Sequence, residues 1–462
     1  MSTEDVVVPV VVVGAGGAGM LAAITAANNG FPVMLLEKSV RGGCNTEFSG
    51  GLVQAAGTRI QRALGVEDSP MTMFNDIMRK NGYRSDPRIV AAIAQRSADV
   101  IDVFLDEVGL DLHLDQNVLY YGHSVHRMHA MPSEAGADLV AGLRAYINRH
   151  ELINFVDNAE FIDATRHAQG WEVTVRHGGE VEDVIVAEKL ILACDGFGRN
   201  RDMLLEYCPE IADAVYIGSE NNTGTGVRVA QKLGAACDLM TAYQGHSHVN
   251  PKYGTRLGGN LPNLGSIMVN TEGRRFERED QGYSEYAQYI LAQSGGIAIE
   301  IFDRPAYDAA IATGSFREAV EAGAVKTAST LEEIADQFDL PVEGFVAEVE
   351  RYNSEVDGTD WLGRSDKRHV LSPPFYGAVV TGALAHTQGG VRIDTSCRTL
   401  TADNGSVEGL FAAGGTAAGI SGDGPAGYMS GNGLIQAFTT GLIAGETVAR
   451  ELLAASVDTK PA

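Results

Sequence analysis

The N-terminal stretch constrains this chain more than any other part of it. It contains, in order, an apolar run, a glycine-rich turn, an alanine-rich segment, a second apolar run and an acid: Val6–Val13, Gly14–Gly19, Met20–Asn29, Val33–Leu36 and Glu37. This order predicts a strand, a tight turn, a helix and a second strand, which together form a dinucleotide-binding unit. Since an acid ends the second strand, a ribose 2′-hydroxyl is favoured, and with it NAD or FAD over NADP.

Each glycine of the turn is required for a different physical reason. Gly14 lets the turn close, Gly16 lets backbone N–H groups approach a pyrophosphate, and Gly19 lets the helix pack against the strand. The start of the helix adds unpaired N–H groups and the positive end of its dipole. We therefore expect the turn and the acid to hold the cofactor: Gly14, Ala15, Gly16, Gly17, Ala18, Gly19 and Glu37.

Composition excludes several classes of function. A chain of 462 residues is too long for one small core and predicts two domains. The net charge of −25 argues against nucleic acid and anionic membranes as partners. Five widely spaced cysteines without a CxxC pattern indicate neither a disulfide framework nor a metal site, and fit a reducing cytoplasm. The N-terminal valine run is too short to span a bilayer and lacks the basic region of a targeting segment.

A polar, glycine-rich loop after Glu37 carries a resemblance to a known family. The segments Arg41–Thr46 and Ser49–Gly51 could wrap a flavin through backbone and short side chains. They resemble the flavoprotein family of fumarate reductases, succinate dehydrogenases and 3-ketosteroid dehydrogenases. Members that bind FAD covalently have a histidine in the place of Asn45, so the resemblance implies non-covalent FAD. It assigns to the cofactor the loop residues Lys38, Gly43, Asn45, Thr46, Ser49, Gly50 and Gly51.

The resemblance covers nearly the whole chain and implies its architecture. The expected fold class is α/β, with a Rossmann-like FAD-binding domain formed by residues 1–243 and 377–462 and an inserted α+β cap domain formed by residues 244–376. Two departures stand out: Thr225 replaces the aspartate of the family's TGDG segment, and Gly415 stands where an acid is common. Further expected cofactor residues are Phe161, Ala193, Asp195, Gly196, Asn200, Gly414, Gly415, Asn432, Leu434 and Ile435.

Apolar periodicity predicts the remaining elements of the first domain. The expected helices are Met71–Arg79, Pro87–Val108 and Ser133–His150. The expected strands are Phe161–Asp163, Trp171–Val175 and Val184–Val186 in a β-meander, followed by Lys189–Gly198, an apolar strand that ends in a glycine turn. The polar and aromatic segment Leu119–His129 fits a pocket lining and a surface loop equally well.

Two tyrosines replace two arginines of the family. A fumarate reductase holds a dicarboxylate with arginines, whose forked donors match a carboxylate. The resemblance puts one of them shortly after Gly273–Phe276 and the other just before Gly431–Gly433, where this chain has Tyr283 and Tyr428. Burying a dianion without these cations costs several kcal/mol per charge. The reacting group is therefore expected to be neutral.

A phenol donates to a carbonyl oxygen and, once deprotonated, acts as a base. By resemblance to the 3-ketosteroid dehydrogenases, Tyr283 would take the α-proton, and Tyr428 with a backbone N–H of Gly431 to Gly433 would bind the carbonyl oxygen. Tyr120 or Tyr121 would assist Tyr283. His246 and His386 match histidines that touch the substrate in the dicarboxylate enzymes, although structural roles fit them nearly as well.

The leading hypothesis is an FAD-dependent desaturase of a cyclic ketone, either a steroid or a smaller oxocyclohexane-type ring. An acid on such a ring could pair with His246, His386, Arg127 or another cap residue. An arginine from elsewhere in the place of the two phenols would contradict this hypothesis. The alternatives are a flavin-dependent reductase of an activated alkene and a non-catalytic flavoprotein that passes electrons within a complex.

Overall fold

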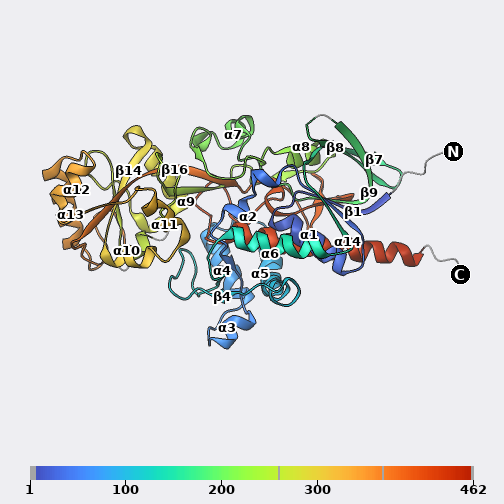
Figure 1. Ribbon diagram of the computed structural model, residues 1–462, viewed down its shortest axis with the longest axis horizontal. Helices are drawn as coiled ribbons and strands as arrows, with labels where there is room; N and C mark the ends of the chain where they lie inside the picture. Colours follow the sequence, from blue (N-terminus) through green and yellow to red (C-terminus); the bar gives the residue numbers. More distant parts are fainter. Residues whose placement is uncertain (1–6, 180, 259–260, 367–368, 459–462) are drawn as a thin grey trace.

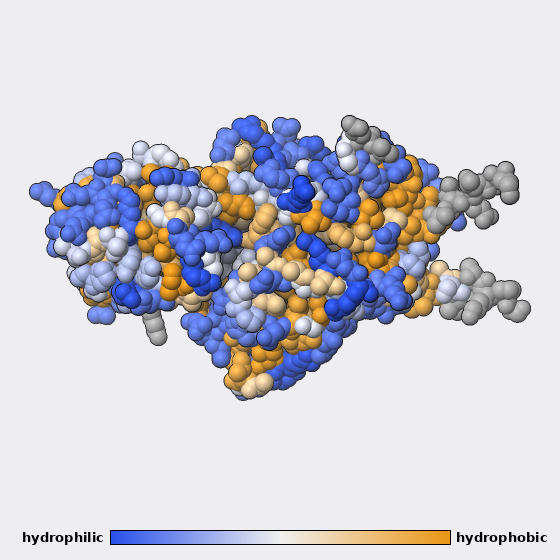
Figure 2. All heavy atoms as spheres, viewed as in Figure 1, coloured by the Kyte–Doolittle hydropathy of each residue, from blue (hydrophilic) through white to orange (hydrophobic). Residues whose placement is uncertain are grey.

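A computed structural model describes residues 7–179, 181–258, 261–366 and 369–458. Figure 1 shows an elongated molecule in which α10, α11, α12 and α13 lie at one end and β1, α1 and α14 toward the other. In the view of Figure 2, hydrophilic residues cover most of the end that carries α12 and α13. Within the described ranges, no helix is both long and apolar enough to cross a membrane.

The predicted strand–turn–helix–strand unit is confirmed. It consists of β1 (Val7–Val13), α1 (Gly17–Asn28) and β2 (Val33–Leu36), and Val6 lies outside the described residues. β1 pairs in parallel with β2 on one side and with β9 (Val181–Leu192) on the other. Because a central parallel strand is covered on both faces, its residues form a continuous apolar run, and the side chains from Val10 to Val12 are fully buried.

The main sheet has the order β18-β19-β9-β1-β2-β6, and the β7–β8 hairpin continues from β9. One prediction was wrong: Val184–Val186 and Lys189–Ala193 do not form separate strands, because β9 is continuous. Its first half pairs with β8 and its second half with β1 and β19. The charged residues Glu188 and Lys189 interrupt the apolar pattern within this strand. The charge of Lys189 is compensated there, because its ammonium lies 2.7 Å from the Glu451 carboxylate. The other strands are β6 (Ile153–Val156), β7 (Ala159–His167), β8 (Gly170–His177), β18 (Arg398–Leu400) and β19 (Ser406–Ala412).

Helix α1 packs against β1 and β2 of this sheet. The long helix α14 (Asn432–Asp458) packs against α1 through two glycines: a Cβ on Gly441 would lie 2.2 Å from the carbonyl oxygen of Ala18, and one on Gly445 would lie 2.6 Å from that of Ala22. The predicted helix Pro87–Val108 is observed as α5 (Pro87–Asp102), continued by a π-helical segment, Val103–Val108. The other helices are α2 (Asn45–Phe48), α3 (Arg59–Ala63), α4 (Pro70–Lys80), α6 (Gly136–Arg149), α7 (Arg201–Tyr207) and α8 (Thr225–Lys232).

A second sheet forms the centre of the cap. Its order is β10-β16-β14-β13, where β10 is Val215–Tyr216, and β12 and β15 also pair with β16. Both predicted domain boundaries, 243/244 and 376/377, fall inside strands, β12 (Tyr243–Val249) and β16 (Phe375–Thr387), and they stay a prediction. The cap contains β13 (Ile267–Val269), β14 (Ile297–Asp303), β15 (Lys326–Ala328), α9 (Tyr283–Leu291), α10 (Arg304–Ala310), α11 (Gly314–Glu321), α12 (Leu331–Gln337) and α13 (Val342–Ser354).

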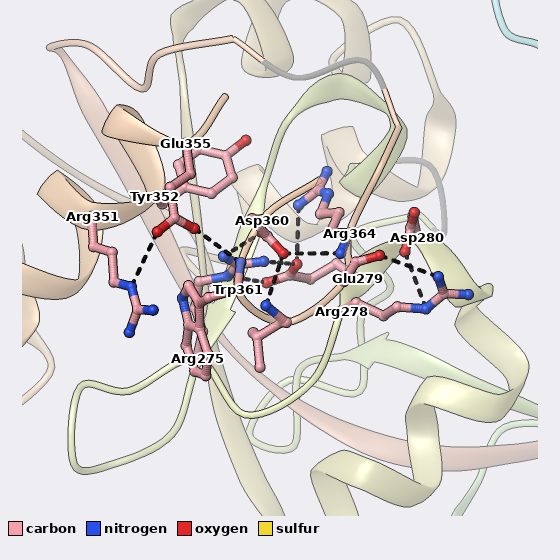
Figure 3. A network of polar contacts seen from close by, with 12 residues as sticks. Arg275, Arg278, Glu279, Asp280, Arg351, Tyr352, Glu355, Asp360, Trp361 and Arg364 are labelled. Carbon is pink, nitrogen blue, oxygen red and sulfur yellow. Dashed lines mark hydrogen bonds and ion pairs between the residues drawn. The ribbon is translucent and has the colours of Figure 1, made fainter. Parts of the chain in front are cut away.

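A buried cluster of ions fixes the chain just before α9 (Figure 3). Arg275 lies 2.6 Å from Glu279 and 2.9 Å from Asp360, and Arg364 lies 3.1 Å from Glu279. All four side chains are fully buried, and Glu279 also accepts the N–H of Met268 on β13. Because the charges compensate one another, the cost of burying them is offset, and the segment that leads into Tyr283 is held in one geometry.

Candidate active site

A cavity of about 990 Å³ lies between the sheet of the first domain and the cap. Its walls come from the β1–α1 turn, the loop after β2, β12, the first residue of α9, the end of β16 and the loop before α14. The expected cofactor residues that line it are Gly14, Gly16, Gly17, Ala18, Glu37, Lys38, Gly43, Asn45, Thr46, Ser49, Gly50, Phe161, Ala193, Asp195, Gly414, Gly415 and Leu434.

The other expected cofactor residues lie behind the cavity wall. Ala15 donates its N–H to Glu37, Asn200 caps α7 by accepting the N–H of Met203, and the amide of Asn432 bonds to Gln54 and Ser421. These hydrogen bonds join parts of the protein to one another, so the three residues position the cavity wall. The residues outside the cavity lining are Ala15, Gly19, Gly51, Gly196, Asn200, Asn432 and Ile435.

One end of the cavity fits a dinucleotide. Gly14 has a φ of +96°, and a Cβ on Gly19 would lie 1.8 Å from the carbonyl oxygen of Gly14. At Gly16, by contrast, an added Cβ would meet only Cys44, at 3.7 Å, so the backbone there is open to a ligand. The Glu37 carboxylate accepts the N–H groups of Ala15 and Ser39 at 2.8 and 3.0 Å, which fixes its orientation toward a ribose. The turn thus presents backbone donors and an acid, as an ADP moiety requires.

The glycine at position 415 has a steric cause. A Cβ on Gly415 would lie 2.0 Å from Oδ1 of Asp195, a residue held at a φ of +64°. Oδ2 of Asp195 accepts the amide of Asn45 at 2.8 Å, and Asn45 in turn accepts the N–H of Ser219. An acid at position 415 is therefore excluded, and Asp195 brings a carboxylate to the same part of the cavity.

Four rings form a continuous wall at the other end. The ring centres of His246 and Tyr283 are 5.2 Å apart, those of Tyr283 and Tyr428 are 6.1 Å apart, and those of Tyr428 and His386 are 5.9 Å apart. These rings come from β12, α9, the loop before α14 and β16, and all of them line the cavity. The structure thus brings together the two tyrosines and two histidines that the sequence singled out.

The two phenols differ in their electrostatic surroundings. Burial raises the pKa of Tyr283, but the hydroxyls of Ser430 and Tyr428 and the charge of Arg256 act to lower it. The Ser430 hydroxyl donates to the Tyr283 oxygen over 3.4 Å. Burial and the neighbouring Tyr283 raise the pKa of Tyr428 well above its ordinary value. The neighbours of Tyr283 therefore stabilise its ionised form, whereas Tyr428 stays protonated and can donate a hydrogen bond.

Both histidines of the wall are neutral. Burial lowers the pKa of His246 well below its ordinary value and also lowers that of His386. Nδ1 of His246 accepts the N–H of His248 at 3.2 Å, so Nε2 carries the proton. The His386 ring covers Gly433, where a Cβ would lie 2.9 Å from Nε2. Gly431 and Gly433 line the same end of the cavity.

The tyrosines predicted to assist have different positions. Tyr120 lines the cavity and donates its hydroxyl to Asp115 at 3.0 Å. Tyr121 does not line the cavity; its ring lies 4.9 Å from the Lys80 ammonium and packs against Gly282, the residue before Tyr283. Burial raises the pKa of Tyr121 to about 12.

Most of the polar segment around these tyrosines supports the fold. Arg127 is fully buried between Asp68 and Asp76, at 3.0 and 2.8 Å. Because two carboxylates already compensate its charge, Arg127 is not available to a substrate acid. His123 bonds to the carbonyl oxygen of Ser430 at 2.9 Å, which ties this segment to the loop before α14.

Arg256 is a cavity residue that the sequence did not single out. It lines the cavity, and its guanidinium donates to the carbonyl oxygen of Phe48 at 2.5 Å. Burial lowers the pKa of Arg256. Nothing in the sequence around Arg256 distinguishes it from a surface arginine. It faces the cavity only because the cap packs against the end of α2, where Phe48 accepts its hydrogen bond.

The chain is similar to known flavoproteins over most of its length. The family model described as an FAD binding domain matches residues 9–434. A fumarate reductase (cytochrome) from Shewanella frigidimarina is 30% identical over 459 residues, which cover 96% of this chain and 77% of that protein.

Solved structures show the same fold. The open conformation of a flavocytochrome c3 fumarate reductase superimposes with a TM-score of 0.81 at 28% identity, covering 98% of this chain and 79% of the other. A 3-ketosteroid-Δ4-(5α)-dehydrogenase from Rhodococcus jostii has a TM-score of 0.76 at 24% identity, with 97% and 98% covered. The expected α/β architecture, a Rossmann-like FAD-binding domain with a cap domain, is confirmed.

Proposed function

Because the chain belongs to the FAD-binding flavoprotein family that includes the fumarate reductases, it is an FAD-dependent oxidoreductase, and we propose that it desaturates a cyclic ketone. The reaction would introduce a C=C bond α,β to the carbonyl. The observation that carries this proposal is the pair of adjacent phenols, Tyr283 and Tyr428, in the cavity. The family and the ring-lined cavity both speak against a protein that only passes electrons.

In the proposed reaction, each phenol has one task. Tyr428 donates its hydroxyl to the carbonyl oxygen, where negative charge develops as the α-proton leaves, and the N–H of Gly433, which bonds to the Tyr428 hydroxyl, strengthens that donor. Tyr283 takes that proton, helped by the Ser430 hydroxyl, which stabilises the ionised phenol. Bound FAD supplies the acceptor for the hydride from the β-carbon. The neutral rings of His246 and His386 enclose the substrate and keep water away.

The cofactor is bound without a covalent link in this proposal. The support is Asn45, whose amide is engaged with Asp195 and Ser219 at the place where covalently flavinylated members have a histidine. A cytoplasmic location belongs to the same proposal and rests on the five unpaired cysteines alone.

The alternative is a flavin-dependent reductase of an activated alkene. The names of the fumarate reductase relatives favour it, and so does the cation of Arg256 in the cavity. Arg256 does not replace the phenols, however, because its bond is to Phe48 and the wall between His246 and His386 is formed by Tyr283 and Tyr428. One arginine also supplies only one of the two charges that a dicarboxylate requires.

Anaerobic titration separates the two reactions. A desaturase loses its flavin absorbance when a saturated cyclic ketone is added, and an added dye acceptor restores it. A reductase instead shows the reverse preference: the chemically reduced protein is rapidly reoxidised by an unsaturated acid, and ketones leave the oxidised flavin unchanged. A panel of ketones from cyclohexanones to 3-ketosteroids, with the acceptor dye, identifies the ring size. Absence of bleaching by every ketone would refute the proposal.

A further inference from the structure

A positive charge lies near the phenol wall without a matching negative charge. Arg256 faces the cavity, and no carboxylate of the described part of the chain lies within ion-pair distance of it. The acid that acts on it electrostatically is Glu318 of α11, which lines the same cavity but is largely exposed. The burial of Arg256 outweighs the effect of Glu318, so its guanidinium is less favourably solvated than in water. A desolvated cation of this kind is stabilised by a bound anion.

The surroundings of Arg256 also suit an anion. The preceding residue, Thr255, lines the cavity, and its hydroxyl oxygen is buried without a hydrogen-bond partner in the described ranges. The start of α11 adds Gly314 and Ser315 to the lining, and a Cβ on Gly258 would lie 4.0 Å from the Ser315 hydroxyl. The N-terminal amides of this helix, which lie beside the Arg256 segment, add a favourable dipole.

Arg256 lies toward one end of the phenol wall. Its charge acts to lower the pKa of His246 and of Tyr283, whereas the pKa shifts of Tyr428 and His386 arise from burial and from other neighbours. The wall therefore has a cationic end at His246 and a neutral, donor-rich end at Tyr428 and Gly433. If the carbonyl oxygen lies at Tyr428, as the proposed function requires, an anion at Arg256 lies across Tyr283 from it.

We propose that Arg256 binds a substrate carboxylate, so that the substrate is a monocyclic ketone with an acid group on the side of the ring remote from the carbonyl. The position of the carbonyl rests on the proposed function, whereas the anion site does not. A guanidinium fork matches a carboxylate with two parallel hydrogen bonds, which fixes the orientation of a small ring between Arg256 and Tyr428. A steroid would instead bring the hydrocarbon of its fused rings against the buried cation.

Binding to the FAD-loaded protein, kept anaerobic with its flavin chemically reduced, tests this site without turnover, because a reduced flavin cannot accept a hydride. Isothermal titration compares 4-oxocyclohexane-1-carboxylate with its methyl ester, which has nearly the same shape and no charge. We expect the acid to bind at least about 30-fold more tightly than the ester. In Arg256→Met the acid is expected to lose about 30-fold in affinity, while the ester changes by less than about threefold. Equal binding of acid and ester, or an unchanged acid affinity in Arg256→Met, would overturn the proposal.

Three further variants serve as controls. Arg256→Lys keeps the charge but not the fork, and an intermediate loss is expected. Glu318→Gln removes the competing acid and is expected to tighten acid binding by about twofold. Arg304→Met removes an exposed cap arginine paired with Asp308 and is expected to have no effect. Flavin absorbance and the thermal midpoint report folding, and if Arg256→Met loses FAD, the lysine and Glu318 variants decide the outcome.

A steroid ligand separates the remaining outcomes. If 4-androstene-3,17-dione binds more tightly than the oxo acid and Arg256→Met leaves its affinity unchanged, the monocyclic acid is refuted. If the oxo acid binds through Arg256 but no ketone bleaches the flavin, the anion site stands and the desaturase proposal fails. If ketones bleach the flavin and binding is independent of Arg256, only the anion site is refuted.

Discussion

The two ends of the cavity are built in different ways. The dinucleotide end comes from one contiguous segment, β1, the turn, α1 and β2, and it works through backbone groups and a single acid, Glu37. The phenol end is assembled from β12, α9, β16 and the loop before α14, and it works through side chains. A backbone N–H donates a hydrogen bond whatever its surroundings, whereas the protonation state of a phenol depends on its burial and on neighbouring charges.

This difference explains where changes of chemistry can occur. The dinucleotide end tolerates few substitutions, because Gly14 and Gly19 leave no room for a side chain. At the phenol end, the proposed function lets single side chains such as Tyr283 and Tyr428 decide which group can react, while the fold remains that of the fumarate reductase relatives. The four predictions below test this division.

The largest expected effect is on the proposed base. Tyr283→Phe removes the group that takes the α-proton, and we expect ketone-dependent flavin reduction to slow by about 10²–10⁴-fold. The flavin absorbance spectrum and FAD content should stay as in the wild type, because Tyr283 lies at the other end of the cavity from the dinucleotide turn. Tyr289→Phe is the matched control, since Tyr289 lies exposed on the same helix. A Tyr283→Phe protein with near-normal turnover would remove Tyr283 from the mechanism.

The next effect concerns the ions that hold Tyr283 in place. Glu279→Gln leaves Arg275 and Arg364 buried with less compensation, and the free energy of unfolding should fall by about 3–5 kcal/mol. Urea unfolding followed by circular dichroism measures it. Arg304→Met breaks an exposed pair with Asp308 instead and should change stability by less than about 0.5 kcal/mol. Equal losses in both variants would show that the buried cluster has no special role.

Substitutions at two glycines of the turn should have different effects, one on the stability of the fold and the other on FAD affinity. Gly19→Ala forces a Cβ toward the carbonyl oxygen of Gly14 and should cost about 1–3 kcal/mol of stability in the FAD-free protein. Gly16→Ala has room at a φ of −78°, so the FAD-free protein should keep its stability within about 0.5 kcal/mol. FAD affinity should nevertheless fall by about tenfold in Gly16→Ala, as measured by flavin fluorescence. If FAD affinity is unchanged in Gly16→Ala, the backbone at Gly16 does not contact the cofactor.

The smallest effect is a shift of the pH profile. Tyr283 must lose its proton to act as a base, so kcat/KM for uncharged cyclohexanone should rise as the pH passes through the raised pKa of Tyr283. The positive charge of Arg256 lowers that pKa, and Arg256→Met should therefore move the rising limb to higher pH by a fraction of a unit. Arg304→Met is the control. A limb that moves to lower pH, or that persists in Tyr283→Phe, contradicts the assignment.

Sequence reasoning succeeded where neighbouring residues build a feature. The β1–α1–β2 unit follows from the spacing of apolar residues and glycines, and the tyrosine pair was found because it replaces two arginines in a family pattern. It failed where partners are distant. The separate strands predicted at 184–186 and 189–193 are one strand, because the pairing of β9 with β8 runs as far as Ala187 and its pairing with β1 already starts at Val186.

The amino-acid sequence by itself determined the dinucleotide-binding unit, the cofactor class and the presence of two phenols in place of the family's arginines, because each depends on local spacing or on a single residue type. Only the tertiary structure decided which charges face the cavity. Arg127 is compensated by two carboxylates, whereas Arg256 is desolvated without such a partner in the described ranges. Burial and pairing are properties of contacts between distant segments, and the same residue type therefore supports the fold at one position and faces the cavity at the other.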